Sequence, residues 1–197
     1  MNTRTLKQSE RIHPKKFALW LGLGTIIMMF AGLTSAFIVR RAAGNWLAFE
    51  LPPLFYISTL VIALSSLTLI FAERSFKQQN RTAYKNLLGF TLLLGIVFVI
   101  LQYAAWMQLT SYGILLRGNP SGSFVYVISG LHAAHVLGGI LILTIFFLKA
   151  LPKLDPVKEL LEEINTEKNL PIEMLSAYWH FVGILWVYLL VFFYYFR

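Results

Sequence analysis

Five long segments without a single charged residue constrain this chain more than any other feature. They cover residues 17–39, 54–72, 86–116, 123–148 and 174–196. Each reaches the roughly 18 residues that mark a candidate membrane-spanning helix. A segment inside a bilayer must satisfy its own backbone hydrogen bonds, and only helices and closed barrels do so. The sequence therefore predicts an all-α integral membrane bundle of five transmembrane helices, in one transmembrane domain covering residues 1–197. The expected spans are about 17–39, 54–72, 86–109, 123–148 and 174–196.

The composition agrees with a membrane protein. The chain is 57% hydrophobic and only 13% charged, whereas a soluble domain carries about 25% charged residues. The first segment, 17–39, is longer than the roughly 7–15-residue apolar core of a cleaved signal peptide, so we expect it to remain as a helix. The chain has no cysteine, which excludes disulfides and thiolate metal sites.

Basic residues gather on one side of the predicted membrane. The N-terminal tail, the loop after the second span and the loop 149–173 hold 13 of the 17 Lys and Arg residues. The other side holds Arg40, Arg41, Arg117 and Arg197. The positive-inside rule then places the N-terminus in the cytoplasm and the C-terminus in the periplasm. This distribution explains the net charge of +8 without a nucleic-acid partner, and we predict none.

The loop 149–173 is the longest connection and holds six of the nine acidic residues. Asp155 is suited to cap a helix with Pro156 at its first position. Apolar residues follow at helical spacing up to Ile164, which predicts a short amphipathic helix lying at the membrane surface. A docking surface for another subunit is the alternative interpretation.

No permanently charged side chain lies deep in a predicted span. Proton pumps and ion-coupled transporters need such residues to carry charge across the bilayer. This chain alone is therefore not expected to be a transporter.

Three histidines are the candidate ligands inside the membrane. His132 and His135 are three residues apart and share a helix face, and a bis-histidine haem would need one ligand from each of two helices, for example His132 with His180. The alternative is that these imidazoles hydrogen-bond between helices, as polar groups in membrane bundles do. We favour the alternative because no carboxylate lies nearby in the sequence to orient metal ligands. We predict no catalytic, metal or cofactor-binding residue in this chain.

Small residues predict close helix packing in the fourth span. Gly130, Ala134 and Gly138 recur at every fourth position, and Gly139 widens this ridge. Ridges of this kind let two helices approach closely.

Trp179 and Trp186 lie seven residues apart and therefore on one face of the last span. We expect both to be packing residues, together with His180. A cation or quinol site built from the aromatic residues of this span is the alternative, but aromatic belts at the two membrane interfaces explain its end residues without a ligand.

Three segments together resemble subunit III of the haem–copper (cytochrome c) oxidase family, in its five-helix bacterial form. The first is GLHAAHVLGG at 130–139, and the second is YWHFV at 178–182 followed by Trp186. The third is LSSLT at 64–68 with GIVFVILQ at 95–102 and Trp106. The likeness extends over residues 19–195.

The resemblance implies a role in a complex. Subunit III of that family holds no redox centre and packs directly against subunit I, helping to sustain its activity and proton uptake. Haem and copper are expected in subunits I and II. We therefore expect a non-catalytic subunit of a respiratory terminal oxidase, a proton-translocating complex that reduces oxygen to water with electrons from cytochrome c or quinol. Its expected partners are subunit I, subunit II, further subunits or a supercomplex, and membrane phospholipids in a bacterial inner membrane.

Three positions depart from the family pattern. Ile26, Ala105 and Gly183 stand where the family often has acidic residues, which weakens any proton-antenna role. Two alternatives also remain open from the sequence: an accessory subunit of a nitric oxide reductase, and a small b-haem membrane protein.

Overall fold

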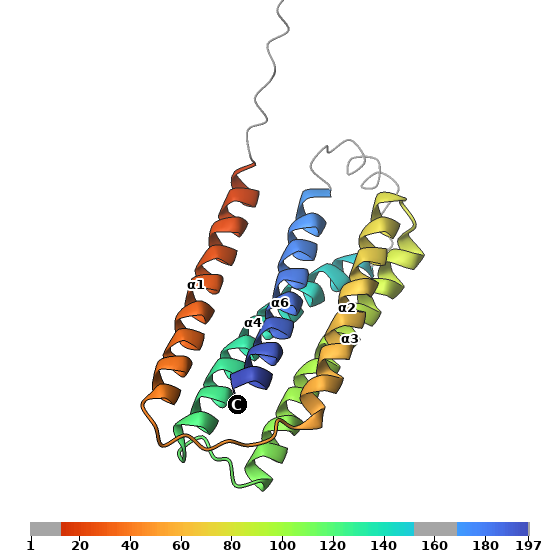
Figure 1. Ribbon diagram of the computed structural model, residues 1–197. Coiled ribbons are helices and arrows are strands. Elements are labelled where there is room, and N and C mark those ends of the chain that lie inside the picture. Colours follow the sequence, from red (N-terminus) through yellow and green to blue (C-terminus); the bar gives the residue numbers. More distant parts are fainter. Residues whose placement is uncertain (1–12, 152–168, 197) are drawn as a thin grey trace, which may run out of the picture.

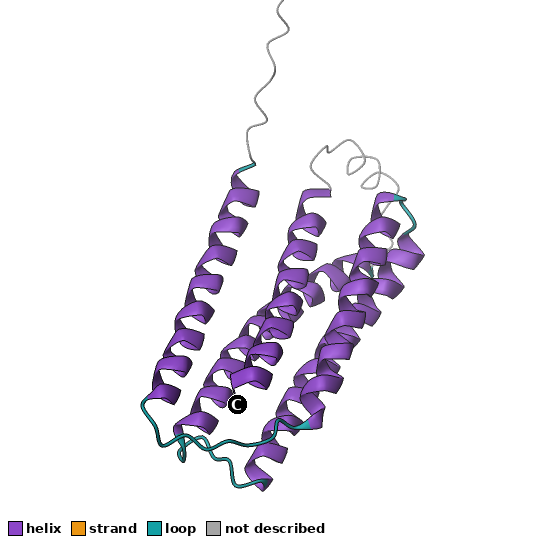
Figure 2. Cartoon of the chain, in the orientation of Figure 1, coloured by secondary structure: helices purple, strands orange, loops and turns teal. Residues whose placement is uncertain are grey.

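The structure is a computed structural model that describes residues 13–151 and 169–196, and all of its regular structure in these ranges is helical (Figure 2). The helices are α1 (Pro14–Ala42), α2 (Pro53–Lys77), α3 (Arg81–Ser111), α4 (Pro120–Ala150) and α6 (Asn169–Phe196). All five are long and apolar enough to cross a membrane. The prediction of an all-α membrane bundle with five spans is confirmed. The amphipathic helix predicted after Asp155 lies outside the described residues.

The helix starts follow local sequence signals. Pro14, Pro53 and Pro120 each open a helix, a position where proline loses no helical hydrogen bond. Asn80 caps α3 by accepting from the backbone N–H of Ala83 at 3.1 Å. This side-chain bond satisfies one of the backbone donors that every helix start leaves free.

Helix α6 is the centre of the bundle. Its backbone approaches those of α1, α2 and α4, whereas among the described helices the backbone of α1 approaches those of α4 and α6. In its most apolar 18-residue stretch 56% of the residues are buried, against 22–28% in the other helices. Helices α2 and α3 lie alongside each other as a hairpin (Figure 1). The last helix of the chain is thus the one around which the others pack.

The C-terminus and the loops α1–α2 and α3–α4 lie at the same end of the bundle (Figure 1). Asn119 ties these two loops together. Its Oδ1 accepts from the backbone N–H of Leu47 at 3.3 Å, and its Nδ2 donates to the carbonyl of Asn45 at 3.1 Å. One asparagine at the start of α4 therefore fixes the chain that leads from α1 to α2.

The outward faces of the helices remain apolar. Met28, Leu60 and Ile184 are 75%, 67% and 69% exposed in the isolated chain. Lipid tails are as apolar as these side chains, so the hydrophobic effect does not drive them inward in a membrane. What holds the bundle together must be sought in close packing and in hydrogen bonds between helices.

Candidate functional site

The indole of Trp179 joins four helices. Its Nε1 donates to Ser65 Oγ on α2 at 2.9 Å. A Cβ atom added at Gly95 on α3 would lie 2.8 Å from its Cη2, and one added at Gly139 on α4 would lie 2.9 Å from its Cζ3. Distances this short leave no room for a side chain. The ring of α6 therefore lies directly on the backbones of α3 and α4 while it bonds to α2.

Trp186 repeats this arrangement two turns further along α6. Its Nε1 donates to Thr59 Oγ1 on α2 at 2.9 Å. Its ring centroid lies 5.6 Å from that of Phe55 and 5.4 Å from that of Phe98. These are the edge-to-face separations at which aromatic pairs attract each other. Both tryptophans of the predicted face are fully buried.

Other side-chain hydrogen bonds also connect neighbouring helices. Gln102 donates to Ser58 Oγ at 2.9 Å, and Trp106 Nε1 donates to Ser129 Oγ at 3.0 Å. The hydroxyl groups of Thr68 and Thr91 lie 2.8 Å apart. We did not predict these partners from the sequence.

The spacing of two hydroxyl residues in α2 is a sequence signal from which the partners of the two tryptophans could have been sought. Thr59 and Ser65 are six residues apart, close to the seven-residue spacing of the two tryptophans on the antiparallel α6. Six residues rise about 9 Å along a helix and seven rise about 10.5 Å, so the two hydroxyl groups and the two indoles match in height, although Thr59 and Ser65 differ by about 120° around the axis of α2. Each hydroxyl can therefore meet one indole.

His132 is enclosed by aromatic rings. It is fully buried, and its ring centroid lies 5.1 Å from Trp186, 6.0 Å from Phe98 and 6.3 Å from Phe30. Neither ring nitrogen has a hydrogen-bond partner within the part of the chain that the structure describes. The interhelical hydrogen bond expected of this imidazole is therefore not found there. The His132 ring lies among aromatic rings of α1, α3 and α6.

His135 faces α1 instead. Its Nδ1 lies 2.7 Å from the carbonyl oxygen of Leu131 in the same helix, and its ring lies 5.8 Å from that of Phe30. The bond between helices at this residue comes from its backbone, because the hydroxyl of Tyr178 donates to the His135 carbonyl at 2.9 Å.

His180 is half-buried in a groove of about 390 Å³ between α2 and α6 that Ser66 and Gly183 also line. Trp186, which contacts His132, is six residues further along α6, or about 9 Å at 1.5 Å per residue. His132 and His180 therefore do not converge on one haem iron. Within residues 13–151 and 169–196, no three His, Asp or Glu side chains form a group able to hold a metal ion.

Two of the three positions at which we expected the family to have acids are buried. Ala105 is fully buried. A Cβ atom added at the buried Gly183 would lie 3.2 Å from Ser66 Oγ. Ile26 is half-buried and packs against the core. Each of these environments suits the small or apolar residue that this chain has.

The small-residue ridge of α4 points away from the bundle. A Cβ atom added at Gly130 would meet nothing within 4 Å, and one at Gly138 would meet only the Tyr178 hydroxyl at 3.7 Å. Ala134, between them, is exposed. Gly139 alone of the four residues packs tightly inside, against Trp179. The ridge thus forms an open, smooth strip on the outer face of α4.

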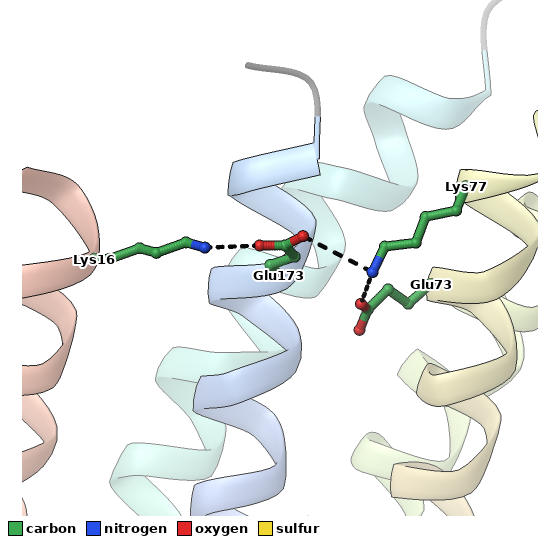
Figure 3. A network of polar contacts seen from close by, with 4 residues as sticks. All are labelled: Lys16, Glu73, Lys77 and Glu173. Atoms are coloured by element: carbon green, nitrogen blue, oxygen red, sulfur yellow. Dashed lines mark hydrogen bonds and ion pairs between the residues drawn. The ribbon is translucent and has the colours of Figure 1, made fainter. Parts of the chain in front are cut away.

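Ion pairs close one end of the bundle (Figure 3). Glu173 of α6 lies 2.9 Å from Lys16 of α1 and 3.8 Å from Lys77 of α2. Lys77 also pairs with Glu73 at 2.8 Å. Because all four side chains are partly exposed, each pair stabilises the bundle by at most about 1 kcal/mol. The pair with Lys16 adds one contact between α1 and α6, beside the ring contacts of Phe37 with Phe192 and the 3.2 Å contact between the Thr34 and Tyr188 hydroxyl groups.

These features define an integral membrane helix bundle whose polar side chains bind its helices to one another. Comparison with known sequences gives the family. Residues 46–197 match the family described as cytochrome c oxidase subunit III, and the chain belongs to that family.

Relatives from distant organisms carry the same description. The "Cytochrome c oxidase subunit 3" of Corynebacterium diphtheriae is 27% identical over 185 residues, which cover 85% of this chain and 83% of the relative. That of Bacillus subtilis is 27% identical, covering 89% of this chain and 83% of the relative. The human protein of the same name is also 27% identical, covering 89% of this chain and 67% of its own length. The resemblance inferred from the sequence segments is confirmed.

Proposed function

We propose that this chain is the non-catalytic subunit III of a respiratory haem–copper terminal oxidase. In this proposal the complex reduces oxygen to water and translocates protons, with its haems and copper in subunits I and II. The chain stabilises subunit I and supports its turnover. Membership of the cytochrome c oxidase subunit III family supports this role. The buried hydrogen bonds between helices, such as the one from Trp179 to Ser65, also support this role, because they use polar groups for packing.

The observation that carries the proposal is the open ridge of Gly130, Ala134 and Gly138. A strip of small residues allows another helix to approach closely, which strengthens van der Waals contact where the hydrophobic effect is absent. No helix in the described part of this chain lies within 4 Å of a Cβ position at Gly130. The ridge is therefore suited to receive a transmembrane helix of subunit I. Subunit II, further subunits or a supercomplex, and phospholipids would cover other faces.

The alternatives have less support. The family match and the names of the relatives favour an oxidase over a nitric oxide reductase. A b-haem protein would need His132 and His180 on one iron, and His132 is instead enclosed by Phe30, Phe98 and Trp186.

The bias of 13 basic residues to 4 supports an N-terminus in the cytoplasm of a bacterial cell and a C-terminus in the periplasm. Because Ile26, Ala105 and Gly183 are not acidic, where the family resemblance implies acids, we propose that the chain acts mainly by stabilising the complex and contributes little to proton uptake.

Co-purification tests this function. The chain is tagged at its C-terminus and extracted from its native membrane in mild detergent. The proposal predicts that a haem-containing oxidase subunit elutes with it and that the eluate consumes oxygen. Elution of the chain without such a subunit would contradict the role. A Soret band from the chain purified alone would instead favour the b-haem alternative.

A further inference from the structure

A groove of about 400 Å³ lies on the outer surface between α3 and α4, near the end of the bundle where α3 begins. It is lined by Lys85, Asn86, Gly89, Phe90, Leu93 and Phe147. Phe147 packs closely on Gly89, because a Cβ atom there would lie 2.8 Å from Cε2 of Phe147. The phenyl ring of α4 thus lies against the backbone of α3 and lines the groove with apolar surface.

The groove is polar at one end and apolar along the rest. Lys85 and Asn86 lie in the second turn of α3, which begins at Arg81. Phe90 and Leu93 are 50% and 55% exposed. Lys85 and Leu93 are eight residues apart, or about 12 Å along the helix. A ligand that fills the groove must therefore combine a polar head with an apolar tail.

The charge of the residues that line the groove indicates which headgroup charge the groove would bind. In the part of the chain that the structure describes, Lys85 has no ion-pair or hydrogen-bond partner, whereas Lys16 and Lys77 at the same end are both paired with Glu173. An ammonium group at the edge of a bilayer attracts anionic lipid headgroups. The amide of Asn86 can donate a second hydrogen bond to a phosphate oxygen.

We infer that this groove binds one anionic phospholipid, with its phosphate on Lys85 and Asn86 and an acyl chain along Gly89 and Leu93 over Phe147. The inference rests on the membrane-spanning fold and not on the oxidase role. The groove between α2 and α6 has no permanently charged residue in its lining, so it offers no comparable selectivity for an anionic headgroup.

Photo-crosslinking in the intact complex tests the site. The complex, extracted in mild detergent, is placed in phosphatidylcholine vesicles that contain a trace of phosphatidylglycerol or phosphatidylcholine bearing the same diazirine-labelled acyl chain. Crosslinked peptides are identified by mass spectrometry in the native protein and in Lys85→Gln, Lys85→Arg and Arg74→Gln. Arg74 lies in the last turn of α2 at the same end of the bundle but outside the groove, so it controls for loss of one charge.

The inference predicts adducts in peptides containing residues 86–93 or 147, with phosphatidylglycerol favoured. Loss of the lysine charge should lower the phosphatidylglycerol adduct about fivefold, the equivalent of about 1 kcal/mol for one basic residue near anionic lipid. Lys85→Arg and Arg74→Gln should keep the adduct. Added inorganic phosphate should not displace it, because the acyl chain supplies part of the affinity.

Three results would overturn the inference. Equal labelling by both lipids would indicate ordinary annular lipid, and an unchanged adduct in Lys85→Gln would show that the lysine does not select the headgroup. Absence of any adduct in these peptides, with labelling elsewhere on the chain, would indicate that a protein partner covers the groove. The haem spectrum of the same sample reports separately whether the chain is in an oxidase.

Discussion

Trp179 Nε1 donates to Ser65 Oγ across 2.9 Å, and this bond connects α6 to α2 at the level where the same indole lies against Gly95 and Gly139. One side chain thus sets the separation of α6 from three other helices. Two glycines are needed because a tryptophan ring lies where their side chains would be. At this level the bundle is stabilised by the packing of the Trp179 ring on Gly95 and Gly139 and by its hydrogen bond to the Ser65 hydroxyl.

Replacing Trp179 should therefore destabilise the fold. Trp179→Phe removes the bond to Ser65, which accounts for about 0.6 kcal/mol and at most about 1.7 in a membrane bundle, and it also leaves space beside Gly139. We expect a total loss of about 2 kcal/mol in the free energy of unfolding, measured by denaturant titration in mixed micelles. Trp20→Phe is the control because Trp20 is 64% exposed on α1 and should change this energy little. Equal losses in the two variants would contradict the role of Trp179.

Two glycines of the same helix should respond differently to a methyl group. Gly139→Ala places Cβ 2.9 Å from the Trp179 ring and should lower the free energy of unfolding by about 1–3 kcal/mol, as overpacking does. Gly130→Ala meets nothing within 4 Å and should leave it unchanged or slightly raised, since alanine favours helix. The same titration measures both. A larger loss in Gly130→Ala would show that the ridge packs inside the chain.

Assembly should depend on the ridge more than on the histidines. Gly138→Leu places a bulky side chain on the outer strip of α4 and should lower the yield of intact complex several-fold, because a partner helix can no longer approach. His132→Leu should assemble at close to the native yield, since an imidazole with unpaired nitrogens is replaced by an apolar group of similar size. Yield is read from the haem-containing band on a native gel. Normal assembly of Gly138→Leu with failure of His132→Leu would reopen a ligand role for His132.

Cysteine labelling in intact cells tests the proposed orientation, because the native chain has no cysteine. Gly118→Cys and Gln78→Cys occupy exposed loops at opposite ends of the bundle. An impermeant maleimide should label position 118 and leave position 78 unlabelled. Ser121 belongs to the same end as Gly118 but is only 1% exposed, so a cysteine there would be shielded. Labelling of position 78 alone would contradict the proposed orientation and indicate the opposite one.

The sequence was sufficient to predict the spans but not the contacts between them. Uncharged runs of this length have no other stable arrangement in lipid, so five helices follow directly. The rotation of each helix about its own axis cannot be predicted in the same way, because these helices are apolar on nearly every face and no polar stripe marks the outside. Hence Trp179 and Trp186 could be placed on one face of α6, but Ser65 and Thr59 could not be named as their partners.

The ridge of α4 shows the same limit. The spacing of Gly130, Ala134 and Gly138 predicts a close helix approach, but it does not say whether the approaching helix belongs to this chain. In the structure the neighbouring Gly139 packs inside and the ridge points outward. A one-residue step along the helix, about 100° around its axis, separates the two roles. His132 could likewise be placed in the membrane but not inside its shell of aromatic rings.

The most direct test of the central claim compares the oxidase complex with and without this chain. Oxygen consumption is followed over many turnovers, and an optical spectrum is recorded for each preparation. The account predicts that the stripped complex keeps its haem bands and its initial rate of oxygen reduction, and then loses activity faster during turnover because subunit I is less stable. Loss of a haem band that tracks removal of this chain, with the other subunits still present, would contradict the non-catalytic role.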